Sequence, residues 1–156
     1  MKKIALIIVA LVMSVAANAQ FEQGKIYANA SLSGLDFSNN KIMGSHFEVG
    51  TKIGYFLWED VSIVARLNYN YYKNDFDIFN AQLGGQYYIT QNGLFLGAGL
   101  NFMVFDGTDV APSFQLGYAF FLNEKVTIEP EVYYNQSLTN SDYSTFGFRI
   151  GLGIYF

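Results

Sequence analysis

Six charged residues stand out because each lies on the small and polar side of a strongly alternating segment. They are Glu48, Lys52, Arg66, Glu129, Glu131 and Arg149. If these segments enclose an interior, the three acids and three bases lie at its middle and should pair, because an unpaired buried charge is costly. The pattern therefore predicts an internal charge network. Such a network either plugs the interior with salt bridges or forms the gate or selectivity filter of a narrow pore.

Catalytic and metal-binding residue types are scarce. His46 is the only histidine, and the neighbouring Ser45 would leave the opposite face of a strand, so a hydrolase would need a serine from another segment. The candidates are Ser31, Ser33 and Ser113. With one histidine and no cysteine there is no typical transition-metal site, and the Asp106–Asp109 string is more typical of a tight turn than of a calcium loop. We expect no enzymatic activity, no cofactor and no metal.

Alternating β-strands must position these residues. In the last fourteen residues, 143–156, large apolar side chains alternate with glycine or polar residues and the chain ends on Phe156, which is the period of a strand with one apolar face. Eight such segments, each long enough to cross a bilayer at a tilt, span about 25–35, 46–57, 61–71, 78–89, 94–105, 110–122, 126–136 and 143–156. Pro130 lacks a backbone donor and predicts a bulge or kink in the seventh segment.

An export signal precedes the strands. Lys2 and Lys3 are followed by an apolar run from residue 4 to residue 12, and Ala17-Asn18-Ala19 is a small-x-small cleavage site. The run is shorter than a membrane-spanning helix requires, which argues against an uncleaved signal anchor. We expect residues 1–19 to be a signal peptide and residues 20–156 to form one all-β domain.

Composition separates a membrane barrel from a soluble one. Charged residues make up 14% of the chain, against roughly 25% in soluble domains, and aromatic residues reach 18%. Glycines crowd the face opposite the apolar one, where a soluble surface would carry Lys and Glu. Small residues suit the interior of a narrow eight-stranded barrel, which also leaves little room for a pore and favours the plug. The net charge of −4 argues against nucleic acid as a partner.

Aromatic residues are expected at two places. Tyrosines on the apolar face near strand ends suit the interfacial girdles of a membrane barrel, namely Tyr69, Tyr71, Tyr87, Tyr118 and Tyr134. A second set has inward parity near the strand ends on the predicted periplasmic side: Tyr27, Phe56, Tyr88, Phe95, Phe121 and Tyr155. This set either forms an aromatic floor that closes one mouth, or joins the girdle where facing relaxes at strand ends.

The signal ending Ala17-Asn18-Ala19, the eight alternating strands and the terminal Tyr155-Phe156 resemble the small outer-membrane β-barrels of Gram-negative bacteria. The transmembrane domain of outer membrane protein A and outer membrane protein X are of this type. The resemblance covers residues 20–156 and implies an antiparallel up-and-down transmembrane barrel, monomeric and surrounded by outer-membrane lipid. It also implies that Ile154, Tyr155 and Phe156 are read by the barrel-insertion machinery. Members of this family differ widely in role, so we expect an envelope or surface-interaction function, with a narrow pore or a lipid-modifying enzyme as alternatives.

Overall fold

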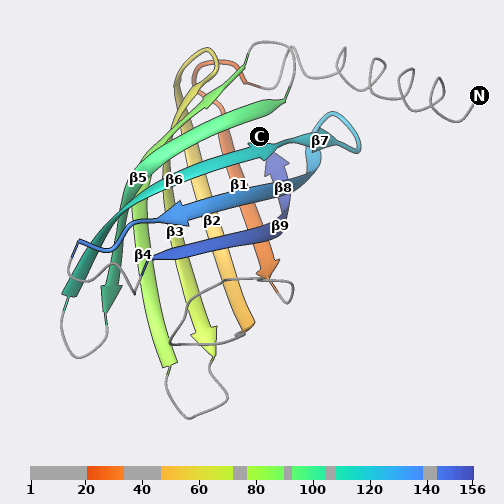
Figure 1. The fold of residues 1–156 in the computed structure, drawn as a ribbon. Helices are drawn as coiled ribbons and strands as arrows, with labels where there is room; N and C mark the ends of the chain where they lie inside the picture. The colour runs from red at the N-terminus through yellow and green to blue at the C-terminus, as the bar shows by residue number, and fades with distance from the viewer. Residues whose placement is uncertain (1–20, 34–46, 72–76, 90–92, 105–107, 139–143) are drawn as a thin grey trace, which may run out of the picture.

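Nine labelled strands, all antiparallel, make up the computed structural model, which describes residues 21–33, 47–71, 77–89, 93–104, 108–138 and 144–156 (Figure 1). They are β1 (Ile26–Ser33), β2 (Phe47–Trp58), β3 (Val61–Tyr71), β4 (Asp77–Tyr88), β5 (Leu94–Val104), β6 (Thr108–Tyr118), β7 (Phe120–Phe121), β8 (Val126–Asn135) and β9 (Thr145–Tyr155). Within the described ranges, no helix is long and apolar enough to span a membrane.

The strands close into one eight-membered ring. Each strand from β1 to β5 pairs with the next along the chain, and β9 pairs with both β1 and β8. Strands β6 and β7 both pair with β8, so together they form the sixth member of the ring. The all-β, eight-stranded antiparallel barrel expected from the sequence is confirmed. Because closure leaves no open edge, every member of the ring pairs with a neighbour on both sides.

Pro130 disturbs its neighbour rather than its own strand. The pairing of β8 with β9 runs without a register shift from Val126 to Asn135, so of the two expected outcomes, a bulge or a kink, the bulge is absent. On the other side, β6 and β7 pair with β8 in one common register in which Tyr118 falls opposite Pro130, and the ladder stops there. Pro130 has no N–H to donate across this pair, which accounts for the division of the sixth strand into β6 and β7.

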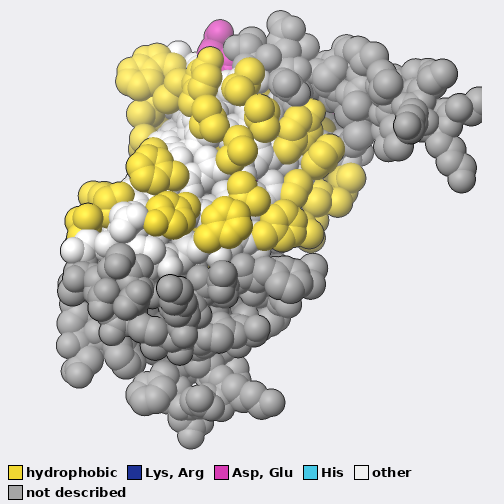
Figure 2. All heavy atoms as spheres, viewed as in Figure 1, with side chains coloured by type: hydrophobic (Ala, Val, Ile, Leu, Met, Phe, Trp, Pro, Cys, Tyr) yellow, Lys and Arg dark blue, Asp and Glu magenta, His cyan; other side chains and the backbone are white. Residues whose placement is uncertain are grey.

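Alternation places large apolar side chains outside and small or polar ones inside. Ile53, Leu83 and Leu152 are each more than half exposed on the outer face, whereas their chain neighbours Lys52, Gln82 and Gly151 are buried. Figure 2 shows apolar side chains spread over the described part of one face, with no basic side chain visible among them. A surface of this composition suits a hydrocarbon surrounding and not water.

Two glycines make room for inward-facing rings. A Cβ at Gly54 would collide with the ring of Tyr27 on the paired strand β1, and one at Gly117 would collide with the ring of Phe95 on β5. The narrow interior therefore holds large side chains because their cross-strand neighbours have none. The inward glycines noted in the sequence are part of the packing of the lumen.

Candidate functional site: the closed lumen

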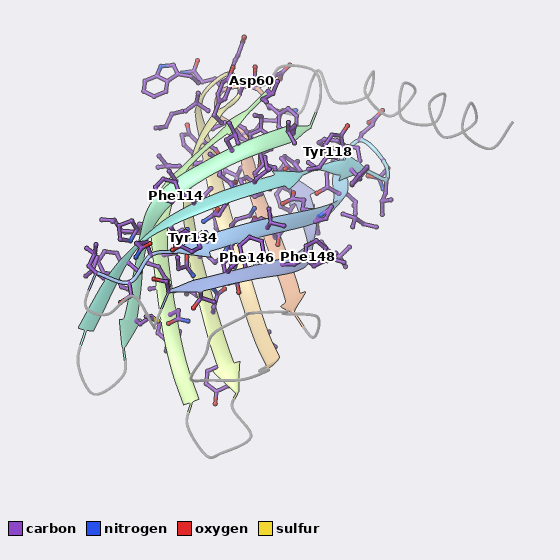
Figure 3. All side chains as sticks on the ribbon, viewed as in Figure 1. Asp60, Phe114, Tyr118, Tyr134, Phe146 and Phe148 are labelled. Atoms are coloured by element: carbon purple, nitrogen blue, oxygen red, sulfur yellow. The ribbon has the colours of Figure 1, made fainter. Side chains whose placement is uncertain are left out.

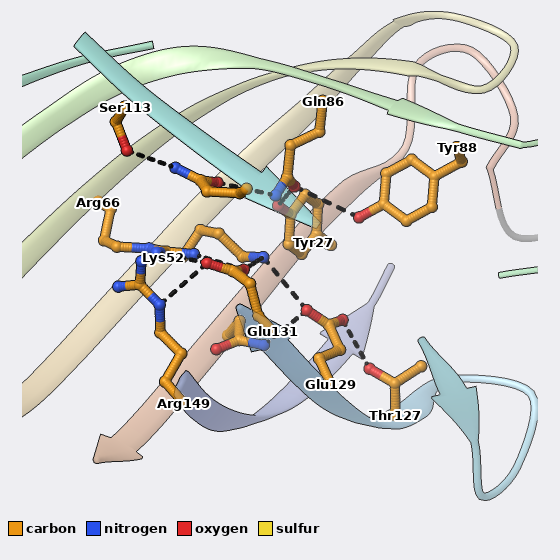
Figure 4. Close-up of polar contacts among 12 residues, drawn as sticks. Tyr27, Lys52, Arg66, Gln86, Tyr88, Ser113, Thr127, Glu129, Glu131 and Arg149 are labelled. Atoms are coloured by element: carbon orange, nitrogen blue, oxygen red, sulfur yellow. Dashed lines mark hydrogen bonds and ion pairs between the residues drawn. The ribbon is translucent and has the colours of Figure 1, made fainter. Parts of the chain in front are cut away.

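Glu131 lies at the centre of the charge network drawn in Figure 4. Its two carboxylate oxygens accept parallel hydrogen bonds from Arg66 Nη1 and Nη2, each 2.9 Å long. Arg149 Nε lies 2.9 Å from Glu131 Oε1, and Lys52 Nζ lies 3.6 Å from Oε2. One carboxylate thus pairs with three cations, and the bidentate arginine contact fixes its orientation.

Glu129 forms a second centre one step nearer to the end of the barrel where Phe21 and Phe156 lie, which we call the terminal end. Lys52 Nζ lies 3.2 Å from its Oε2, to which Asn29 Nδ2 also donates at 2.8 Å. Its Oε1 accepts hydrogen bonds from Thr127 Oγ1 at 2.8 Å and from the Tyr155 hydroxyl at 2.9 Å. Lys52 therefore bridges the two carboxylates, and each carboxylate oxygen has donors of its own.

Strand order explains why these groups meet. Strands β3 and β8 are four places apart around the eight-membered ring in either direction, so the Arg66–Glu131 pair crosses the lumen. Glu131 and Arg149 are direct partners on β8 and β9, and Lys52 and Arg66 are direct partners on β2 and β3. The side chains reach one another only because the sheet is closed. The side chains of these four residues and of Glu129 are at most 4% exposed, and together they fill the middle of the barrel.

The sixth predicted member of the network, Glu48, lies in β2 with its backbone opposite Asn70, but its side chain lies outside the described residues. His46 and Ser45 also lie outside them, as do the side chains of Ser31 and Ser33. Ser113 is buried, and its Oγ accepts a hydrogen bond from Gln115 Nε2 at 3.4 Å. Among the described residues no group of three or more His, Cys, Asp or Glu side chains could hold a metal ion.

An aromatic cluster closes the lumen at the terminal end. It contains the six residues of inward parity, which are at most 6% exposed: Tyr27, Phe56, Tyr88, Phe95, Phe121 and Tyr155. The rings of Tyr27 and Tyr155 stack with centroids 5.2 Å apart, and Tyr88 packs against both Phe56 and Phe95 at 5.4 Å. These residues therefore face the interior, and they form the floor, one of the two arrangements the sequence allowed.

Hydrogen bonds and cation–π contacts join the aromatic cluster to the charges. The Tyr27 hydroxyl donates to Gln86 Oε1, and the Tyr88 and Tyr155 hydroxyls share a hydrogen bond of 3.2 Å. Lys52 Nζ lies 5.0 Å from the centroid of the Phe95 ring and 5.2 Å from that of Tyr27. The cluster and the network thus form two adjoining layers of one packed interior.

Phe21 joins the aromatic cluster from outside the strands, where the alternation of the sequence does not predict it. It precedes β1, is 5% exposed, and stacks on Tyr88 with ring centroids 4.2 Å apart. Strand alternation could not reveal it because it lies outside any strand. The available signal was an aromatic residue between the predicted cleavage site and the first strand.

The outer aromatic residues mark the edges of the apolar face. Tyr69, Tyr87 and Tyr134 are exposed near strand ends, and Tyr118 is half-buried at the terminal end; the side chain of Tyr71 lies outside the described residues. Pairing places Phe114, Tyr134 and Phe146 side by side across β6, β8 and β9, as Figure 3 shows. The predicted C-terminal signal is divided: Tyr155 is buried in the lumen, whereas Ile154 and Phe156 are exposed.

The fold is that of the small outer-membrane β-barrels. No protein-family model matches the chain, and no curated protein matches its sequence. The chain is similar to the N-terminal β-barrel domain of Pseudomonas aeruginosa OprF, at 18% identity and a TM-score of 0.66 over 86% of this chain and 98% of that one. It is also similar to Neisserial surface protein A (NspA), at 17% identity and a TM-score of 0.63 over 85% and 96%. A de novo designed transmembrane β-barrel matches at 11% identity and a TM-score of 0.64 over 88% and 99%.

Proposed function

We propose that this protein is a monomeric, integral outer-membrane barrel with a structural role in the envelope or in surface interaction, and that its interior does not conduct. The observation that carries the proposal is the Arg66–Glu131 pair, which crosses the lumen inside a buried network of five charges. A filter needs space beside its charges for an ion to pass. Here the carboxylates of Glu129 and Glu131 already bind side chains of the barrel itself.

The apolar outer face supports placement in a lipid bilayer, with the terminal end on the periplasmic side. Export would depend on a signal peptide at residues 1–19 and insertion on the barrel-insertion machinery, which would read Ile154, Tyr155 and Phe156 in the unfolded chain. The protein would act without catalysis, cofactor or nucleic acid. Incubating the folded protein with labelled lipid A tests the enzymatic alternative, and any modified product would contradict the proposal.

Arg149→Met separates a plug from a filter. Arg149 Nε lies 2.9 Å from Glu131 and its guanidinium carbon lies 3.9 Å from the centroid of the Tyr133 ring, so its removal takes away one of the three cations around Glu131. The plug predicts a lower free energy of unfolding in lipid vesicles, with Arg149→Lys as the control that keeps the charge. A stably folded Arg149→Met barrel that passes ions with altered selectivity would show a filter instead.

A further inference from the structure

At the terminal end, four rings surround Phe21 and come from every second member of the eight-stranded ring. They belong to Phe56 on β2, Tyr88 on β4, Phe121 on β7 and Tyr155 on β9, with centroids 4.2 to 5.9 Å from that of Phe21. A residue in contact with four such strands stands on the axis of the mouth. The barrel wall thus supplies a ring-shaped seat, and the segment before the first strand supplies its occupant.

The backbone of residues 21–25 is fastened to the rim. Asp60 N–H donates to the carbonyl of Phe21 at 2.9 Å, and the Asp60 carbonyl accepts from Tyr88 N–H at 2.7 Å. Asp60 reaches both partners in a left-handed conformation with φ of 62°, which aspartate tolerates better than most residues. The conformation of Asp60 in the turn between β2 and β3 thus allows this turn to bind residues 21–25.

A second pair of main-chain hydrogen bonds holds the chain between Phe21 and β1. Gly24 N–H donates to the carbonyl of Phe56 at 2.9 Å, and Phe56 N–H donates to the carbonyl of Lys25 at 2.9 Å. Gly24 has a φ of +87°, which turns the chain from the mouth into β1 and favours glycine. A side chain at this position would meet no atom within 4 Å, so the backbone conformation is the only obstacle to replacing it.

We propose that Phe21 is a stopper that binds in the aromatic seat formed by Phe56, Tyr88, Phe121 and Tyr155 and seals the terminal mouth of the lumen. The ligand of this seat is thus a segment of the same chain, the second residue after the predicted cleavage site. The proposal rests on the proposed non-conducting barrel and extends it: the rings of the wall form the rim of the closure at this mouth, and a residue outside the wall fills its centre. Aromatic contacts hold the stopper, and residues 21–25 form a strap that can be released without unpairing a strand.

The test uses a cysteine in a chain that has none. Ser62 is fully buried, faces the lumen between its pairing partners Phe56 and Gln86, and has no hydrogen-bond partner for its Oγ among the described residues. Ser62→Cys therefore places a thiol beside the seat with little change of contacts. A small, charged, water-soluble thiol reagent is added to the mature chain folded into lipid vesicles, and labelling is followed over time.

We expect slow labelling when Phe21 is present and a rise on the order of tenfold or more with Phe21→Ala, because four aromatic contacts are lost. Gly24→Ala should raise labelling in the same direction by straining the strap while keeping the ring. Phe120→Ala, which removes an exposed ring at the same end, is the matched control and should leave the rate unchanged.

Equal labelling with and without Phe21 in a barrel that remains folded by gel mobility would overturn the proposal. If Phe21→Ala fails to fold, Gly24→Ala decides alone, and an unchanged rate there overturns it as well. The result is separable from the proposed function. A barrel that stays silent in planar bilayers while Phe21→Ala and Gly24→Ala leave the labelling of Ser62→Cys unchanged would overturn the stopper and leave the non-conducting role intact.

Discussion

The lumen is closed by two adjoining layers that use different physics. In the aromatic cluster the rings interlock by shape, and every member is neutral and packs against at least one other ring. In the charge network closure depends on matched partners, and three cations share the carboxylate of Glu131. A layer built on shape should tolerate the loss of some volume, whereas a layer built on charge should not tolerate the loss of one member.

Among the substitutions that compare the two layers, Glu131→Gln should lower the free energy of unfolding the most. The change is nearly isosteric but leaves three buried cations without their shared carboxylate, which should lower the free energy of unfolding by about 3–5 kcal/mol. Urea unfolding in lipid vesicles, followed by the fluorescence of the single tryptophan Trp58, measures it. Glu129→Gln should cost less, because three of the four donors to Glu129 are neutral. Equal costs for the two variants would show that charge matching at Glu131 is not special.

Leu83→Arg tests whether the outer face meets hydrocarbon. Leu83 is 59% exposed in the middle of β4, and an arginine near the bilayer midplane costs about 2–4 kcal/mol. Leu122 is equally exposed but follows β7 at the terminal end, where the same replacement should cost about 0–1 kcal/mol. The same unfolding assay applies. If Leu83→Arg leaves the free energy of unfolding unchanged, this face does not lie in the bilayer.

Gly54→Ala tests how tightly the aromatic layer is packed. The added methyl group would collide with the Tyr27 ring and force it to move, at a cost of about 1–3 kcal/mol. Gly85→Ala on β4 is the control, since its added Cβ would come no closer than 3.6 Å to the Ser62 carbonyl oxygen. The denaturation midpoint of Gly54→Ala should be clearly lower than that of Gly85→Ala. Identical midpoints would show that the Tyr27 ring can move away from the added methyl group without cost.

Phe56→Leu should have the smallest effect. Phe56 is fully buried among Phe21, Tyr27, Tyr88 and Tyr155, but leucine keeps the apolar character of the site and much of its volume. We expect a loss of at most about 1.5 kcal/mol in the same assay. A loss as large as that of Glu131→Gln would remove the distinction between the two layers.

Much of the barrel follows from its alternation. A period of two fixes which side chains share a face, so Lys52, Arg66 and Glu131 could be assigned to the interior without knowing their partners. The partners themselves depend on closure, because Arg66 meets Glu131 only across the ring. Sequence parity alone does not set the order and stagger of the strands that bring them within 2.9 Å.

The sequence was a poorer guide where backbone conformation outside the strand pattern decides the outcome. Pro130 was expected to disturb β8, but its missing N–H interrupts the pairing with β6 and β7 instead, which depends on the side to which the proline nitrogen is directed. Phe21 was overlooked because its place depends on tethers to Asp60 and Phe56 through main-chain atoms. Main-chain hydrogen bonds of this kind leave little trace in side-chain patterns.

Planar-bilayer recording on the folded mature chain tests the central claim most directly. The network of Lys52, Arg66, Glu129, Glu131 and Arg149 together with the aromatic cluster predicts a silent bilayer, with folded protein demonstrated in the same membrane by its mobility on a gel. Discrete, steady openings of the unmodified chain would contradict a closed lumen and identify the protein as a narrow channel.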